Sequence, residues 1–316
     1  MKNIAVMGLG YISKRVAEGV QLSKNAHLYA LASRDKEKAI QMANTMNVEH
    51  AYTYEEMLLD SNIDIVYICT PNREHINHIK MCMDHGFHVI CEKPLCKDCN
   101  EVKEIYAYAR SKNCFFLEAE KTIFTPLNTV LKKKIEEGVI GKLRMIDASY
   151  VAHIEFKDYD KDRWNFDSEY GGSSFDVGVY PLCFANFHAN SNIIKHTIQR
   201  SNAHGLNCDF DAAMLLQYEN GIIATLRSSW DLPSTNRGIL LGEEGYIEIN
   251  DNYITLTSLG NEIASKTYER HEILTKALVS LGVNKETALN DACKIEHDLS
   301  EESFNAIKNH LEKYNK

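Results

Sequence analysis

The sequence has no long apolar run. Its longest apolar stretches, such as residues 63–69, are far shorter than the ~20 residues that a helix needs to span a bilayer. The first residues, Met1-Lys2-Asn3, lead directly into an apolar stretch, without the charged region, apolar segment and cleavage site of an export signal. We therefore expect a soluble protein located in the cytoplasm.

An excess of basic residues is also missing. The 35 Lys and Arg residues are outnumbered by 44 Asp and Glu residues, which gives a formal net charge of -9 at pH 7. A chain with this balance repels a phosphate backbone, and the only basic run, Lys132 to Lys134, falls in a helical pattern. We expect a small-molecule substrate and no nucleic-acid partner. The sequence also shows no internal repeat, linker or low-complexity segment.

The cysteines also lack the spacing of a disulfide framework or of a metal site. The nine cysteines are odd in number and scattered, which favours free thiols in a reducing compartment. Cys96 and Cys99 form a lone CxxC pair, with no second pair and no nearby histidine to complete four zinc ligands. His75 and His78, three residues apart, meet the same objection. We therefore predict no metal site.

The length and composition indicate a globular chain of two domains. The composition, 44% hydrophobic and 25% charged, is that of a globular protein, and 316 residues are more than usually fold around one hydrophobic core. In the first 120 or so residues, apolar stretches alternate with helix-like segments, as in a parallel sheet covered by helices. Asp35 is a candidate helix N-cap, and Thr53 with Glu56 forms a capping box. The predicted strands cover residues 3–7, 28–33, 63–69, 88–91 and 115–118.

The pattern changes after about Thr122. A helix is expected over residues 127–137, and alternating segments then predict a mostly antiparallel sheet, with a hairpin at Asn220-Gly221. Residues 175–189 and 298–314 have helical patterns. The predicted strands of this second part cover residues 147–154, 212–218, 222–229, 238–241 and 246–249.

A glycine-rich motif, Gly8-Leu9-Gly10-Tyr11-Ile12-Ser13, follows the first strand and opens a helix. Glycines at this place let the backbone turn tightly and approach a pyrophosphate, which the helix N-terminus would bind. Gly8, Gly10, Tyr11 and Ile12 are therefore candidate cofactor residues. The sequence predicts an α/β protein: an N-terminal Rossmann dinucleotide-binding domain over residues 1–121, then an α+β domain with an open, mostly antiparallel sheet over residues 122–316.

The second strand ends at Ser33-Arg34, where a site specific for NAD usually carries an acidic residue. Arg34 can pair with a 2′-phosphate through charge-assisted hydrogen bonds, and Ser33 can donate another. NADP(H) is favoured as the cofactor, with NAD(H) possible. The alternative is that Arg34 is a solvated surface residue beside the cap Asp35.

Two further motifs fall at strand ends and therefore on the ligand-binding edge of the sheet. Thr70, Pro71 and Asn72, followed by His75, are candidate cofactor residues, as are Glu92 and Lys93 of the segment Glu92-Lys93-Pro94. Lys93 is expected beside the nicotinamide. The alternative is a surface lysine that precedes a helix started by proline.

Together with Gly171-Gly172 and the segment Asp176 to Pro181, these motifs make the whole chain resemble the Gfo/Idh/MocA oxidoreductase family. The resemblance implies that Lys93, Asp176 and Tyr180 are catalytic. It also implies that Lys121, Arg163 and Trp164 bind substrate, and that the open sheet forms a homodimer or homotetramer. Tyr180 stands where inositol dehydrogenase-like members have histidine, so the sequence is more similar to the dihydrodiol dehydrogenase and glucose–fructose oxidoreductase branches.

The expected reaction is hydride transfer between nicotinamide and a carbinol or carbonyl, which needs one acid/base group. Tyr180 is the candidate. Its phenol has an ordinary pKa near 10, and Lys93 would have to supply ~4 kcal/mol to lower that pKa to about 7. Asp176 is assigned to orienting Lys93 or to binding a substrate hydroxyl. The alternatives are a non-catalytic dinucleotide-sensing regulator and an NAD-assisted glycosidase on the same scaffold.

Overall fold

The computed structural model describes residues 1–152, 164–202, 205–250, 253–255, 258–295 and 299–314, with no account of the side chains of Trp164, residues 253–268, Glu312 and Tyr314. Contacts divide the chain into two units, residues 1–251 and residues 252–316. The boundary predicted between residues 121 and 122 lies inside the first unit and stays a prediction.

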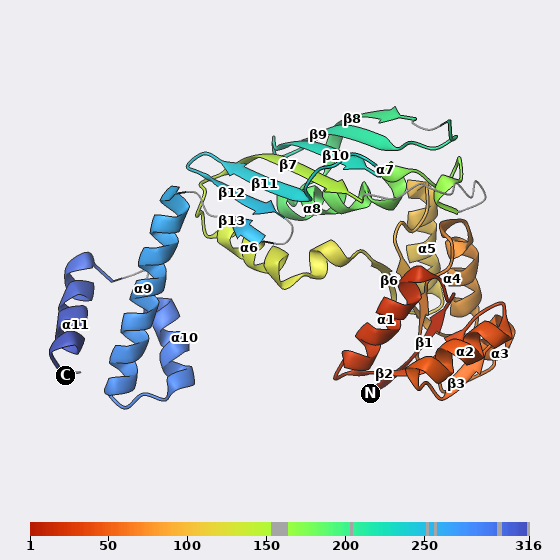
Figure 1. The fold of residues 1–316 in the computed structure, drawn as a ribbon, viewed down its shortest axis with the longest axis horizontal. Helices are drawn as coiled ribbons and strands as arrows, with labels where there is room; N and C mark the ends of the chain where they lie inside the picture. The colour runs from red at the N-terminus through yellow and green to blue at the C-terminus, as the bar shows by residue number, and fades with distance from the viewer. Residues whose placement is uncertain (153–163, 203–204, 251–252, 256–257, 296–298, 315–316) are drawn as a thin grey trace. The chain divides into compact units, whose positions relative to one another are not determined.

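The first sheet has six parallel strands in the order β3-β2-β1-β4-β5-β6, so the predicted parallel, helix-covered sheet is confirmed (Figure 1). The order changes direction at β1, and the carboxyl ends beside such a point form a ligand-binding crevice. The strands are β1 (Lys2–Met7), β2 (Ala26–Ala32), β3 (His50–Tyr52), β4 (Ile65–Ile68), β5 (His88–Glu92) and β6 (Phe116–Ala119), and the helices are α1 (Tyr11–Leu22), α2 (Lys36–Met46), α3 (Tyr54–Leu58), α4 (His75–Asp84) and α5 (Cys99–Ser111).

Capping side chains mark where two of the helices beside this sheet begin. The Asp35 side chain accepts hydrogen bonds from the backbone N–H groups of Glu37 and Lys38, at 3.0 and 3.3 Å. Thr53 and Glu56 exchange the two bonds of a capping box, at 2.8 and 3.2 Å. Both predicted caps are therefore confirmed. Strand β3 was not predicted, since three half-buried residues carry almost no periodic signal.

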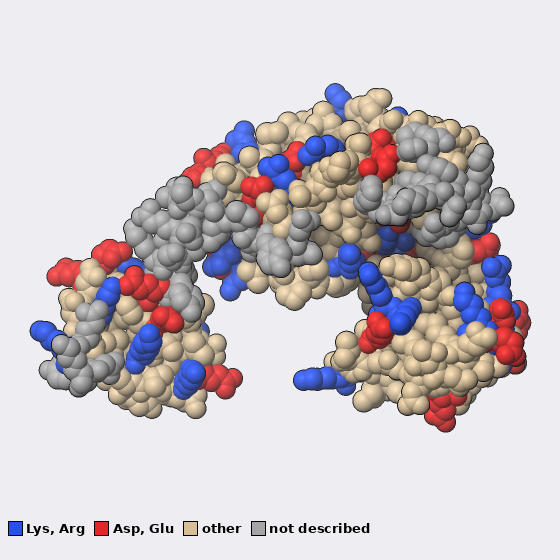
Figure 2. Space-filling model, in the orientation of Figure 1, with Lys and Arg blue, Asp and Glu red and all other residues tan. Residues whose placement is uncertain are grey.

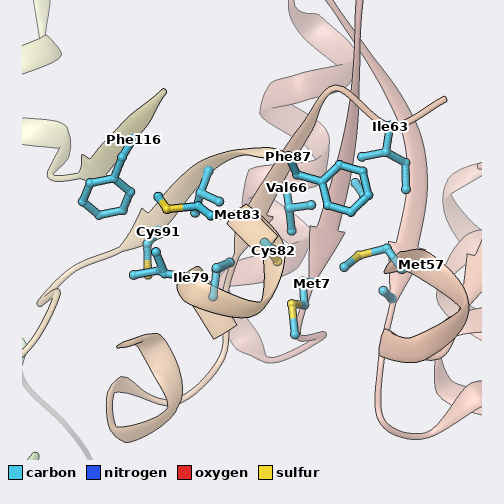
Figure 3. Close-up of a cluster of buried hydrophobic side chains, with 14 of the residues drawn as sticks. Met7, Met57, Ile63, Val66, Ile79, Cys82, Met83, Phe87, Cys91 and Phe116 are labelled. Atoms are coloured by element: carbon cyan, nitrogen blue, oxygen red, sulfur yellow. The ribbon is translucent and has the colours of Figure 1, made fainter. Parts of the chain in front are cut away.

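The core of the first sheet is rich in sulfur and aliphatic side chains. Figure 3 shows Met7, Val66 and Cys91 from the strands with Ile79 and Met83 from α4, and all five are at most 1% exposed. A parallel strand buried on both faces is expected to carry a continuous apolar run rather than an alternating one. This explains why these strands could be predicted from sequence.

The second sheet runs β12-β11-β7-β10-β9-β8 within residues 1–251. Only β7 and β10 pair in parallel, and the mostly antiparallel character is confirmed. The Asn220-Gly221 turn joins β9 to β10, and Gly221 has a φ of 88°. The elements of this part are η2 (Lys121–Phe124), α6 (Pro126–Glu136), β7 (Leu143–Val151), η3 (Trp164–Phe166), α7 (Ser173–Asp176), α8 (Val179–Ala189), β8 (Ile193–Ser201), β9 (Asp211–Tyr218), β10 (Ile223–Ser229), β11 (Arg237–Gly242) and β12 (Tyr246–Asn250).

Helix α8 covers one face of this sheet. Gly238 of β11 makes room for Phe184, because a Cβ at residue 238 would lie 2.8 Å from the ring. The strand residues that alternate with the covered ones leave large apolar side chains exposed on the other face. They are Met145, Leu215, Ile223 and Tyr246, which are 39–51% exposed.

One prediction in this part needs correction, and one strand was not predicted. The single helix expected over residues 175–189 is two helices, α7 and α8, since the chain bends at Gly178. A Cβ on Gly178 would lie 2.6 Å from the Ser174 carbonyl oxygen, so the backbone packs more closely there than a side chain allows. Strand β8 was not predicted, because its residues are almost all exposed and have no apolar alternation.

The C-terminal unit contains β13 (Tyr253–Thr255) and the helices α9 (Ser258–Ser280), α10 (Lys285–Ile295) and α11 (Glu301–Tyr314). The predicted helix over residues 298–314 corresponds to α11, whereas α9 and α10 were not predicted. Arg270 joins α9 to α11: it donates to the Leu299 carbonyl at 3.0 Å, pairs with Glu301 at 3.0 Å and lies over the Phe304 ring.

Figure 2 shows Lys and Arg side chains interspersed with Asp and Glu over the face in view. Across the described residues, no helix combines the length and the apolar character that crossing a membrane requires. All nine cysteines are free, as expected.

Candidate active site

The glycine loop is built as a dinucleotide site requires. Gly8 follows β1 with a φ of 90°, and a Cβ there would lie 2.7 Å from Thr70 Cγ2, so only glycine fits. Nothing lies within 4 Å of a Cβ built on Gly10, and no side chain caps α1 at that residue. The N–H groups of the first turn of α1 are therefore suited to a pyrophosphate. Ser13 is fully buried and donates to the Gly10 carbonyl at 2.6 Å.

The other cofactor residues predicted in and near the ends of β1 and β2 lie around the glycine loop. Tyr11 is 85% exposed and stacks with Arg15, while Ile12 packs partly into the core. Ser33 is buried at the end of β2, and its hydroxyl accepts a hydrogen bond from the Asp35 N–H at 3.2 Å. Arg34 is exposed, which suits it to a phosphate ligand and equally to a solvated position.

The motif after β4 holds the strand ends together. Fully buried His75 places one ring nitrogen 2.9 Å from the Thr70 carbonyl and the other 3.0 Å from the Pro94 carbonyl. Burial lowers the pKa of His75. Asn72 is buried and donates to the Tyr170 carbonyl at 3.2 Å. His75 and Asn72 thus support the backbone around Pro71 and the turn after Lys93.

The carboxyl end of β5 delivers Lys93 to the centre of the site. Its ammonium donates to the Asp176 carboxylate at 3.1 Å and to the Asp176 carbonyl, and it lies 4.7 Å from the centre of the Tyr180 ring. Glu92 beside it accepts a hydrogen bond from the Tyr67 hydroxyl at 2.9 Å. The structure therefore brings Lys93, Asp176 and Tyr180 together, although Asp176 and Tyr180 lie on two separate helices, α7 and α8.

The charges of this triad are coupled. Burial lowers the pKa of Lys93, but Asp176 and Tyr180 more than offset it, so its net pKa is raised and the ammonium is stable. Burial raises the pKa of Tyr180 and Lys93 only partly counteracts it, so the net pKa of the phenol is also raised. Lys93 acts on Tyr180 in the expected direction, but Tyr180 remains a protonated phenol that can donate.

Two aromatic residues that the sequence analysis did not select complete the site. Buried Trp230 donates from its indole N–H to Asp176 at 3.3 Å, and the Tyr150 ring centre lies 4.5 Å from that of Tyr180. Trp230 is one of only two tryptophans, which is the one signal that could have drawn attention to it. Nothing local marks Tyr150, since it lies in an ordinary alternating strand.

The loop before Asp176 is fixed by a buried carboxylate. Asp209 accepts hydrogen bonds from both the Ser173 and Ser174 hydroxyls at 2.8 Å and from the Ser174 N–H at 2.8 Å. Gly172, with a φ of 98°, passes so close that a Cβ would lie 2.5 Å from Asp209 Oδ1. This explains why Gly171-Gly172 precedes the segment that carries Asp176.

The predicted substrate residues are described only in part. Lys121 lies over the rings of Tyr180 and Tyr150, at 4.9 and 5.9 Å from their centres. Arg163 lies outside the described residues. The backbone of Trp164 belongs to η3, and its side chain lies outside what the structure describes. The substrate roles of these three residues stay predictions.

Three family models match the chain. Residues 2–119 match "Oxidoreductase family, NAD-binding Rossmann fold", and residues 129–248 match "GFO/IDH/MocA C-terminal domain". Residues 257–316 match "Iron dependent repressor, metal binding and dimerisation domain". Among the described residues no three His, Cys, Asp or Glu side chains gather as a metal site requires.

Similar proteins agree with the first two matches. A trans-1,2-dihydrobenzene-1,2-diol dehydrogenase from Xenopus tropicalis is 29% identical over 73% of this chain and 69% of its own length. The human protein of that name is 27% identical over 77% of this chain and 73% of its own. An aldose-aldose oxidoreductase from Caulobacter crescentus shares the fold, with a TM-score of 0.73, 22% identity and coverage of 81% and 78%. A 3-ketoreductase from Actinomadura kijaniata, solved with NADP, gives a TM-score of 0.68, 23% identity and coverage of 80% and 76%.

Proposed function

The chain belongs to the Gfo/Idh/MocA oxidoreductase family, and from this premise we propose that it transfers a hydride between nicotinamide and a carbinol or carbonyl of a small polar substrate. A sugar, a polyol or a dihydrodiol would be of the right kind. The observation that carries the proposal is the convergence of Lys93, Asp176 and Tyr180 at the carboxyl edge of the parallel sheet.

Each residue of the triad has a distinct role in this proposal. Tyr180 gives its proton to the carbonyl oxygen in reduction and takes it back in oxidation. The Lys93 ammonium stabilises the phenolate that forms, and Asp176 keeps Lys93 charged and oriented. A bound nicotinamide supplies or accepts the hydride.

The experiment is a screen of sugars, polyols, dihydrodiols and dicarbonyls with NADP(H) and NAD(H), following the absorbance of the reduced cofactor. We expect net cofactor turnover by the wild-type chain and its loss in Lys93→Met. A dinucleotide sensor would bind cofactor without turning it over. An NAD-assisted glycosidase would release its leaving group without net change of the free cofactor. Either result would replace the proposal.

We propose NADP(H) as the preferred cofactor, with the 2′-phosphate bound by Ser33 and Arg34. The support is an exposed guanidinium at the end of β2, with no carboxylate at that strand end before Asp35, whose side chain caps α2. Titration should show NADPH binding several-fold more tightly than NADH, and Arg34→Ala should remove the difference. Equal affinities in the wild type, or an unchanged preference in the variant, would contradict the assignment.

We also propose a homodimer or homotetramer formed through the open face of the second sheet, in a reducing compartment such as the cytoplasm. The exposed apolar residues Met145, Leu215 and Ile223 support this surface. Leu215→Glu should shift the mass measured by light scattering to that of a monomer. An oligomer that persists in this variant would direct attention to residues 257–316, which are similar to a dimerisation domain.

A further inference from the structure

Two lysines reach the proton-transfer residue from neighbouring strand ends. Strands β5 and β6 pair in parallel, and Glu92 is level with Ala119, so the segments that follow lie side by side. Lys93 follows β5 directly, and Lys121 opens η2 just after β6. Their ammonium groups lie 4.7 and 4.9 Å from the centre of the Tyr180 ring.

The two ammonium groups differ in their partners. Lys93 is 12% exposed and is paired with Asp176. Lys121 is only partly open to solvent and has no ion pair or hydrogen-bonded acceptor within the part of the chain that the structure describes. Its contacts there are the faces of Tyr180 and Tyr150. The charge of Lys93 is therefore neutralised inside the protein, whereas that of Lys121 is available to a ligand.

The nearby carboxylates are bound to other groups. Glu120, which precedes Lys121, accepts hydrogen bonds from the N–H and hydroxyl of Thr122 at 3.0 and 2.7 Å. Glu92, the other carboxylate whose charge acts on Lys121, accepts one from the Tyr67 hydroxyl at 2.9 Å. Burial and then the charge of Lys93 lower the pKa of Lys121, which is the signature of a partly desolvated cation beside a like charge. An anion bound at this point would relieve both costs.

We propose that Lys121 binds an oxyanion carried by the substrate, so that the chain acts on an acidic sugar or acidic polyol with a carboxylate or phosphate near the reacting carbon. The inference rests on the proposed hydride transfer and names its substrate class. Lys121 lies over the Tyr180 ring. A charge-assisted hydrogen bond from its ammonium to the substrate anion would orient the substrate carbinol toward that phenol.

The cofactor pyrophosphate is the competing ligand, because Arg15 of α1 is close enough to repel Lys121. The pyrophosphate already has the first turn of α1 as its site, and Lys121 contacts Tyr180 instead of the glycine loop. The experiment must nevertheless separate the two ligands.

The test is calorimetric titration of the full chain, saturated with NADP+, using D-glucose, D-glucuronate and D-glucose 6-phosphate as probes. We expect at least one anionic probe to bind about tenfold or more tightly than glucose, as for a hydrogen bond to a charged group. The two anionic probes distinguish a carboxylate from a phosphate site. If neither binds more tightly than glucose, the proposal is overturned.

Lys121→Gln should remove the preference for the anionic probe over glucose, since the ammonium that would bind the anion is lost without a large change in shape. The matched control is Lys132→Gln on α6, where the ammonium lies 4.6 Å from the Phe187 ring, and this variant should keep the preference. A Lys121→Gln variant that keeps the anion preference but loses NADPH affinity would overturn the proposal in favour of the pyrophosphate. Failure to detect hydride transfer would count against the proposed function alone, because the charge preference is measured by binding.

Discussion

The two sheets of residues 1–251 use their surfaces differently. The parallel sheet is buried between helices on both faces, so its chemistry is confined to the strand ends, where Gly8 and Lys93 lie. The second sheet is covered on one face by α7 and α8, which carry Asp176 and Tyr180. Its other face is left open and apolar. The candidate active site is therefore an edge of one sheet facing the helical layer of the other, and neither sheet supplies it alone.

The largest effect is expected when one proposed catalytic group is removed from each side of the candidate site. Lys93→Met and Tyr180→Phe should each lower turnover by about 10²-fold or more, the usual scale for loss of acid/base catalysis. Cofactor affinity should change much less, since the glycine loop and the end of β2 are intact. Steady-state kinetics with an established substrate and cofactor titration measure the two quantities.

The double variant tests whether the two sides act as one unit. Its loss should be far smaller than the product of the single losses, because Lys93 acts partly through Tyr180. Multiplied losses would mean independent roles. Near-normal turnover in Tyr180→Phe would leave Lys93 as the leading proton donor.

The two faces of the second sheet should respond differently to the same truncation. Leu226 is 1% exposed on the covered face, and Leu215 is 51% exposed on the open face. Leu226→Ala should lower the free energy of unfolding by about 2–5 kcal/mol, and Leu215→Ala by less than about 1 kcal/mol. Urea unfolding at low protein concentration compares them. Similar losses would mean that the open face is also covered in solution.

The two glycines of the loop should separate stability from binding. Gly8→Ala should cost about 1–3 kcal/mol of unfolding free energy, because its φ is 90° and its Cβ would press on Thr70. Gly10→Ala should cost less, about 0.5–1 kcal/mol, since open space surrounds that position and alanine is only a poorer helix N-cap than glycine. Both should weaken NADPH binding. A Gly10→Ala variant that binds NADPH normally would place the pyrophosphate elsewhere.

Buried histidines should make the free energy of unfolding depend on pH. Burial lowers the pKa of His188 to about 4, so below a pH of ~6.5 the unfolded chain binds a proton that the folded chain does not. Stability should therefore fall by up to about 1.4 kcal/mol per pH unit as the pH drops from ~6.5 toward the folded pKa of about 4, and the effect is absent above this window. His188→Gln should reduce that slope, while burial of His75 in the first sheet maintains a remainder. An unchanged slope would contradict this account.

Much of the architecture could be predicted because its signals are local. The capping box at Thr53, the cap at Asp35 and the apolar runs of β1, β4 and β5 are all contained within a few residues. Strands β3 and β8 could not be predicted, since one is too short for a periodic pattern and the other lies exposed at a sheet edge.

Three features can be identified from the amino-acid order alone: the glycine loop, the positions of Thr70, Glu92 and Lys93 at strand ends, and the family resemblance that selected Asp176 and Tyr180. Each depends on residue type and local order, which the chain carries before it folds.

The interactions between these groups could be seen only in the folded chain. It paired Lys93 with a carboxylate 83 residues away, added Trp230 and Asp209, and gave the Tyr180 phenol a net raised pKa despite the nearby ammonium. The physical reason is that burial and charge separation depend on which distant segments pack together, and no local pattern records these quantities.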